Sequence, residues 1–91
     1  MSYNYQEQRP RIFTEDGFTR LTRIREYVLS RIKFSGAVMM NNVLMEVSSS
    51  GRDGSDWDKL ACVDYLVERG EIREISQTRS VPGQARIFVA G

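Results

Sequence analysis

The sequence has no histidine and only one cysteine among its 91 residues. Histidine is the usual general base near neutral pH and the commonest metal ligand, so its absence removes the simplest route to catalysis. The lone Cys62 cannot form an internal disulfide, and without histidine it cannot complete a zinc site. We therefore expect no enzyme activity, no metal and no cofactor. We interpret Cys62 as a packed side chain within a helix rather than as a reactive thiol.

The chain also lacks a long apolar run and a strong charge imbalance. No apolar run approaches the roughly 18 residues that span a bilayer, and the N-terminus M-S-Y-N-Y-Q-E-Q-R-P-R has no apolar signal region. These features predict a cytoplasmic protein without membrane contact, and the length fits one domain. Thirteen basic and twelve acidic residues give a net charge of +1, so any surface that attracts DNA must be local.

Phosphate-binding and calcium-binding motifs are missing too. The stretch R-D-G-S-D-W-D invites comparison with a calcium loop. Counting from Asp53, however, puts Trp57 at a ligand position and Asp58 where a glycine is required. No glycine-rich phosphate cradle follows a predicted strand.

The most informative stretch runs from Ser55 to Val89. Ser55 and Asp58 form an S-x-x-D signal for a helix start, and Gly70 supplies the left-handed residue that ends a helix. Between them, apolar residues recur at three-and-four spacing: Leu60, Val63, Leu66 and Val67. Residues 71–77 and 84–89 then have the pattern of two short strands, joined by a polar loop that turns at Pro82-Gly83. The sequence therefore predicts a helix followed by a hairpin.

An earlier helix is predicted to start at Thr14 or Thr19 and to reach about Phe34. Its expected apolar stripe consists of Phe18, Leu21, Ile24, Val28 and Ile32. The opposite face carries Arg20, Arg23, Tyr27 and Arg31, which either contact a nucleic-acid backbone or form a solvated helix face. Residues 1–13 are polar and without period, so we expect a flexible arm ahead of a single domain over residues 14–91.

Between these two regions the chain breaks at Ser35-Gly36. Residues 37–39 form a candidate short extended piece, and Asn41 or Asn42 could cap a second helix running to about Val47. The polar loop S-S-S-G-R-D-G then leads into the third helix. We interpret Met39, Met40 and Met45 as gap-fillers in a small core, with an adaptable partner surface as the alternative.

The predicted fold class is α+β: a three-helix bundle followed by a two-stranded antiparallel hairpin. This order resembles the winged-helix superfamily, and L-V-E-R-G-E-I-R-E-I resembles the junction between recognition helix and wing in small bacterial winged-helix regulators. The resemblance covers roughly residues 18–89. The connection over residues 48–54 is longer than the turn of about three to four residues in a standard helix-turn-helix.

The resemblance implies a transcriptional regulator that binds double-stranded DNA, with the third helix in the major groove and the wing on the backbone or minor groove. The residues able to make such contacts lie at the start of that helix and in the hairpin: Arg52, Ser55, Lys59, Arg73, Gln77, Thr78, Arg79, Ser80, Gln84 and Arg86. An ordinary polar hairpin is the competing interpretation.

The outward face of the third helix suits a different partner. It is aromatic and acidic, and it comprises Trp57, Asp58, Ala61, Asp64, Tyr65 and Glu68. Acids oppose binding to phosphate, whereas aromatic residues ringed by charge are typical of protein interfaces. The alternative function is therefore a protein-interaction or dimerisation module without DNA binding. A combined form would pair two copies through this face and contact DNA through the wings.

Overall fold

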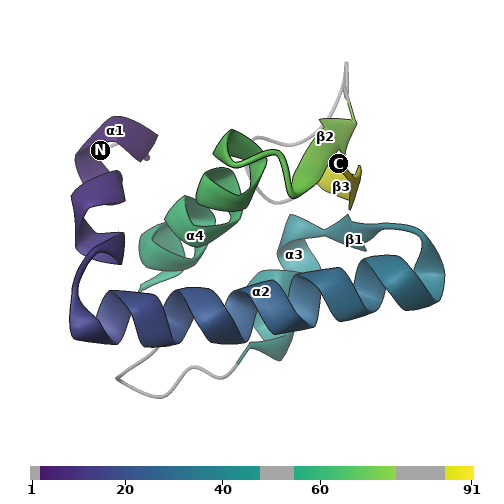
Figure 1. The fold of residues 1–91 in the computed structure, drawn as a ribbon, viewed down its shortest axis with the longest axis horizontal. Coiled ribbons are helices and arrows are strands. Elements are labelled where there is room, and N and C mark those ends of the chain that lie inside the picture. Colours follow the sequence, from purple (N-terminus) through teal and green to yellow (C-terminus); the bar gives the residue numbers. More distant parts are fainter. Residues whose placement is uncertain (1–2, 48–54, 76–85) are drawn as a thin grey trace.

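The computed structural model describes residues 3–47, 55–75 and 86–91. Over these residues the elements follow in the order α1 (Tyr5–Gln8), the 3-10 helix η1 (Arg9–Ile12), α2 (Glu15–Ser35), β1 (Val38–Met39), α3 (Met40–Glu46), α4 (Asp56–Glu68), β2 (Ile72–Ile75) and β3 (Ile87–Ala90). The described chain is thus α+β, with four α-helices and a three-stranded antiparallel sheet, and the predicted fold class is confirmed at this level (Figure 1). None of the described helices is both long and apolar enough to cross a bilayer.

Helix α2 spans the molecule and starts at the first of the two predicted caps. The Thr14 hydroxyl accepts a hydrogen bond from the Gly17 N–H at 3.0 Å. At the other end Gly36 has φ of 86°, a conformation that glycine adopts without strain, and this confirms the predicted break. Ile24, Val28 and Ile32 are buried as expected.

The first turns of α2 are rotated relative to the predicted stripe. Phe18 was expected to face the core but is 51% exposed, whereas Arg20 was expected to face solvent and is buried. The cause is Gly17, whose missing side chain lets the chain at Arg11 and Ile12 lie directly against the helix. The inward line therefore runs from Gly17 through Arg20 to Ile24.

Helix α4 begins with the predicted capping box. The Ser55 hydroxyl accepts from the Asp58 N–H at 3.3 Å, and the Asp58 carboxylate accepts from the Ser55 N–H at 3.0 Å. Its apolar side, Leu60, Val63 and Leu66, lies in the core. The helix ends before Gly70, which has φ of 77°.

The antiparallel pairing predicted for the hairpin is confirmed between β2 and β3, from Ile72↔Ala90 to Ile75↔Ile87. The predicted turn at Pro82-Gly83 lies outside the described residues. The short extended piece predicted at residues 37–39 is also present, and it joins the sheet as β1, which pairs Val38 with Phe88 and gives the order β1-β3-β2. Helix α3 starts at Met40 rather than after Asn41 or Asn42, because the Met40 N–H continues the strand by donating to the Arg86 carbonyl at 2.8 Å.

For residues 3–13, the structure corrects the expectation of a flexible N-terminal arm. Residues 5–12 form α1 and η1, which lie against α4 (Figure 1). The side chain of Ile12 is in the core, and the Asn4 side chain caps α1 by accepting from the Glu7 N–H. Each element is only about one turn long, too short to display an apolar period. We call residues 3–13 the N-terminal segment.

Candidate functional site

The aromatic and acidic face of α4 is covered by the N-terminal segment. Arg11 Nε donates to Asp58 Oδ1 at 2.7 Å, and Tyr3 donates through its hydroxyl to Asp64 at 2.6 Å. Glu68 accepts from the Tyr5 hydroxyl at 2.8 Å and from Arg9 in a two-pronged pair, the shorter contact being 2.8 Å. The sequence indicated no partners for the acidic side chains of α4. In the structure, they bind the N-terminal segment and hold it against the helix.

The pKa values of these groups follow from the same contacts. For Asp58, burial raises the pKa, but hydrogen bonds from Arg11 and from the Ser55 backbone outweigh it, so the pKa lies below its ordinary value. Hydrogen bonds from Arg9 and Tyr5 lower the pKa of Glu68. Burial and the hydrogen bond to Asp64 raise the pKa of Tyr3. The carboxylates of Asp58 and Glu68 are thus held in their charged form against their partners.

The aromatic residues of this face are engaged as well. The rings of Tyr3 and Trp57 meet edge to face at 6.5 Å between centroids, and those of Phe13 and Tyr65 do so at 5.5 Å. Ala61 is buried. The prediction that these α4 residues form a free interaction surface is therefore wrong, because the N-terminal segment already occupies it.

Two predicted DNA contacts are also corrected. Lys59 is only 2% exposed, and its Nζ donates to the carbonyl oxygens of Val47 at 3.3 Å and of Leu44 at 3.4 Å. Arg86 is paired with Asp64 at 2.6 Å and with Glu74 at 2.8 Å. Both side chains hold elements of the fold together: Lys59 joins α4 to the end of α3, and Arg86 joins α4 to β2.

Of the remaining predicted DNA contacts, Ser55 caps α4 and Arg73 is exposed on β2. No ion pair of Arg73 is found within the described ranges. The other predicted contacts lie outside the described residues: Arg52, Gln77, Thr78, Arg79, Ser80 and Gln84.

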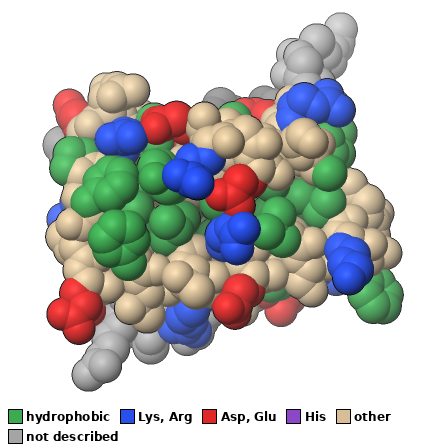
Figure 2. Space-filling model, viewed as in Figure 1, with side chains coloured by type: hydrophobic (Ala, Val, Ile, Leu, Met, Phe, Trp, Pro, Cys, Tyr) green, Lys and Arg blue, Asp and Glu red, His purple; other side chains and the backbone are tan. Residues whose placement is uncertain are grey.

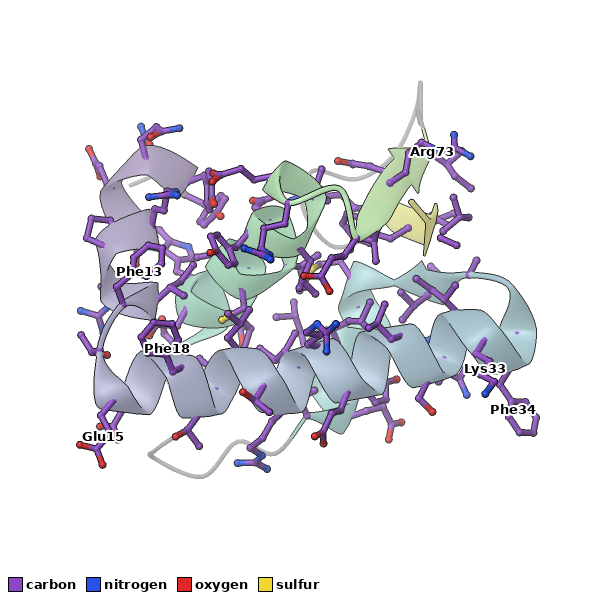
Figure 3. All side chains as sticks on the ribbon, viewed as in Figure 1. Phe13, Glu15, Phe18, Lys33, Phe34 and Arg73 are labelled. Atoms are coloured by element: carbon purple, nitrogen blue, oxygen red, sulfur yellow. The ribbon has the colours of Figure 1, made fainter. Side chains whose placement is uncertain are left out.

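Instead of the α4 face, the structure presents two surfaces at opposite ends of α2, and the first is acidic. We call Phe13, Glu15, Asp16 and Phe18 the acidic end (Figure 3). Phe13 is 42% exposed and its ring meets that of Phe18 edge to face at 5.9 Å. Glu15 and Asp16 occupy the first turn of α2, where the helix dipole favours acids. Arg9 lies over the Phe13 ring at 5.0 Å, but its charge is paired with Glu68.

The opposite surface is basic. We call Lys33, Phe34 and Arg73 the basic end, and all three lie at the end of the molecule that carries the hairpin (Figure 3). Phe34 is 90% exposed. In the space-filling view, the largest group of hydrophobic side chains lies at the left end, and Lys and Arg side chains are spread over the whole face, the right end included (Figure 2). Within the described part of the chain, neither Lys33 nor Arg73 has an ion pair.

The outer surface of the sheet extends the basic end. Val38 and Phe88 are paired and buried, so side-chain alternation turns their neighbours Met39 and Ile87 outward. Ile75 pairs with Ile87 and therefore faces outward too, as does Arg73 opposite Val89. Met39 and Ile75 are among the exposed large hydrophobic residues. The interpretation of the three methionines as core fillers is therefore correct only for Met40, which is buried. Met39 is exposed on the sheet, and Met45 is exposed on α3.

A groove of about 440 Å³ lies between the end of α4 and the hairpin, lined by Val67, Gly70, Ile72, Arg73, Glu74 and Gly91. It holds one cation and one acid, and the acid is paired with Arg86. No group of three potential metal ligands comes together among the residues that the structure describes.

Sequence reasoning missed both ends of α2 for identifiable reasons. Phe18 and Phe34 were assigned to a helix. The helical period does not show which turns of that helix the neighbouring elements leave exposed to solvent. One signal was available: Glu15 and Asp16 begin the helix and Lys33 ends it, so charge of opposite sign is separated along its length. The chain matches no protein-family model, no curated protein and no solved structure, so function has to be argued from these residues.

Proposed function

We propose that the chain is a protein-interaction module of winged-helix type, which binds an acidic, aromatic-bearing protein surface through its basic end. Three features support a winged-helix arrangement: the order α2, β1, α3, α4, β2, β3, the sheet order β1-β3-β2, and the hairpin that directly follows α4. The N-terminal segment is an addition to that plan, and it lies where a winged helix would contact the major groove.

The observation that carries the proposal is the exposure of Phe34 next to Lys33, which has no ion pair in the described part of the chain. A phenylalanine gains roughly 1.5–3 kcal/mol when it is fully buried, and this one remains 90% exposed in the isolated chain. Lys33 adjoins it, and Arg73 with outward-facing residues of the sheet lies at the same end (Figure 3). An aromatic anchor with a charged rim is the usual composition of a protein interface.

The expected chemistry of the partner follows from the signs of these charges. Lys33 and Arg73 favour carboxylates at the rim of the partner's surface. Phe34 requires an apolar pocket or an aromatic side chain at the centre of that surface. A partner without acidic side chains would leave two cations partly desolvated and unpaired, which lowers affinity. The expected partner surface is therefore acidic and apolar together.

A titration with two synthetic peptides tests the proposal. One peptide is an amphipathic helix with glutamates around a phenylalanine stripe, and the other has lysine in place of every glutamate. We expect the acidic peptide alone to shift backbone amide NMR signals at Lys33, Phe34 and Arg73, with an effect that weakens as salt is added. Phe34→Ala should abolish the shifts, while Met45→Ala, which removes an exposed apolar side chain from α3, should preserve them.

Three results would contradict the proposal. Equal binding of both peptides would show that charge plays no part, and shifts spread over the whole protein without a maximum at the basic end would show that no defined surface exists. Absence of binding by the acidic peptide at millimolar concentration would also contradict the proposal.

DNA binding through the hairpin is a second candidate, and the exposure of Arg73 favours it. Arg73 is on β2, and Arg79 follows six residues later in the sequence, outside the described residues, so the two together are candidates for phosphate contacts that do not involve α4. Mixed duplex DNA should then bind with an affinity that falls steeply between about 50 and 200 mM salt, and Arg73→Ala should reduce the slope. Undetectable binding at low salt would remove this candidate.

A further inference from the structure

We infer that the partner of the basic end is the acidic end of a second copy of this chain, so that copies join end to end along α2. The inference rests on the proposed function, because it requires the basic end to be a protein-binding surface. It adds the identity of the partner, and with it the geometry of the assembly.

The two ends are complementary in charge and in apolar character. The basic end presents Lys33 and the 90%-exposed ring of Phe34, while the acidic end presents Glu15 at the start of α2 and Phe18 about one turn further along. Neither Glu15 nor Asp16 forms an ion pair within residues 3–47, 55–75 and 86–91. The exposed rings of Phe13 and Phe18 offer an aromatic step against which a third ring can pack edge to face. A single interface thus satisfies charges and buries rings from both sides.

Within one molecule these surfaces cannot meet. Helix α2 has 21 residues, which at about 1.5 Å per residue separates its ends by roughly 30 Å. The ends point away from each other (Figure 3), and the molecule measures 31 Å along its longest axis. Each copy therefore offers one surface of each kind to its neighbours. End-to-end contact also places the negative end of one helix dipole against the positive end of the next.

Such a contact is heterologous, because different surfaces of the two copies meet. Heterologous contacts close into rings or extend as open chains, and they do not stop at a symmetric dimer. The symmetric alternatives are disfavoured by charge: two acidic ends would bring carboxylates together, and two basic ends would bring Lys33 against Lys33.

The test uses two variants, each with one end disabled. The acidic-end variant carries Glu15→Gln with Phe18→Ala, and the basic-end variant carries Lys33→Gln with Phe34→Ala. Sedimentation velocity of the wild type should show species larger than a dimer that grow with concentration and shrink with salt. Each variant alone should self-associate at least about tenfold more weakly.

A mixture of the two variants gives the decisive result. One intact acidic end and one intact basic end remain in the mixture, on different chains, so we expect a one-to-one dimer that does not grow further. Met45→Ala is the matched control for loss of an exposed apolar side chain, and it should associate as the wild type does. All these substitutions are at exposed positions, and circular dichroism and thermal unfolding would verify the fold of each variant.

The inference falls if either variant alone associates like the wild type, because its surviving contact would then join like ends. It also falls if the wild type is monomeric up to millimolar concentration. In that case, binding of the acidic peptide to the basic end would leave the proposed function standing with a different partner, and failure of the peptide as well would overturn both.

Discussion

Removal of the Lys59 side chain should destabilise the protein strongly, although a lysine near a helix start would ordinarily be a solvated residue. Its stem is buried in the core region, and its ammonium group bridges from α4 to the carbonyl oxygens of Val47 and Leu44 at the end of α3. The last carbonyls of a helix have no partner within the helix. Lys59 supplies partners for two of them.

The magnitude can be estimated from the groups lost. Lys59→Ala removes three buried methylenes, at about 0.8 kcal/mol each, and leaves buried carbonyl oxygens without their donor, at about 1–3 kcal/mol. The sum is about 4 kcal/mol, a large part of the 5–15 kcal/mol by which proteins of this kind are usually stable. Lys59→Met keeps most of the apolar volume but also leaves the carbonyl oxygens without a donor, so its cost should be about 1–3 kcal/mol, smaller than that of Lys59→Ala.

Urea unfolding followed by the fluorescence of Trp57, the one tryptophan, would measure these free energies. Lys33→Ala provides the control, because that lysine is exposed and its loss should change the free energy of unfolding by less than about 0.5 kcal/mol. The reasoning is refuted if Lys59→Ala costs no more than Lys33→Ala, which would mean that Lys59 is solvated. Loss of DNA binding by a fully stable Lys59→Met variant would also refute it.

Three further predictions concern other buried groups. Gly17→Ala should lower the free energy of unfolding by roughly 3 kcal/mol in a thermal melt, because the added Cβ would lie 2.3 Å from the Arg11 carbonyl oxygen; an unchanged midpoint would contradict that close approach. Burial raises the pKa of the Cys62 thiol to about 12, so a thiol reagent at pH 8 should react only with unfolded protein, and reaction at the rate of a free thiol would disprove the burial. The pKa of Asp58 is lowered in the folded state, so its charge stabilises the fold above its unfolded pKa, and this contribution is lost on acidification below about pH 4. Asp58→Asn should therefore flatten the pH dependence of the free energy of unfolding in that range. An unchanged pH dependence at acid pH would show that Asp58 makes no such contribution.

Local signals in the sequence predicted the local structure well. The start of α4 depends on Ser55 and Asp58, three positions apart, and the ends of α2 and α4 depend on Gly36 and Gly70. Each of these features is decided by neighbouring residues, so one stretch of sequence contains all the information needed. The hairpin was predictable for the same reason, because its two strands are close in the sequence.

The N-terminal segment could not be predicted because its contacts are distant in the sequence. Tyr3 and Asp64 are 61 residues apart, and Arg11 and Asp58 are 47 residues apart. The sequence around each of these residues gives no indication of its distant partner. The acids on α4 consequently resembled a free surface, although Asp58 and Glu68 pair with Arg11 and Arg9 of the N-terminal segment.

Lys59 illustrates the limit of projecting a helix onto a wheel. The projection identifies which residues share a face, and it assigned the apolar face of α4 correctly for Leu60, Val63 and Leu66. The projection cannot reveal that α3 ends next to Lys59, where its last carbonyl oxygens accept hydrogen bonds from the lysine ammonium group. The exposure of Phe34 likewise depends on where the sheet stops covering α2, which no helical period encodes.

The middle strand of the sheet has a consequence for synthesis of the protein on the ribosome. β3 is formed by residues 87–90, yet it separates β1 from β2 and is the only described strand bonded to both. A nascent chain that has emerged as far as β2 can form its helices, but it has no partner for either earlier strand. Sheet formation must therefore wait for residue 90, and until then the strand edges and the core position of Phe88 stay open to chaperones.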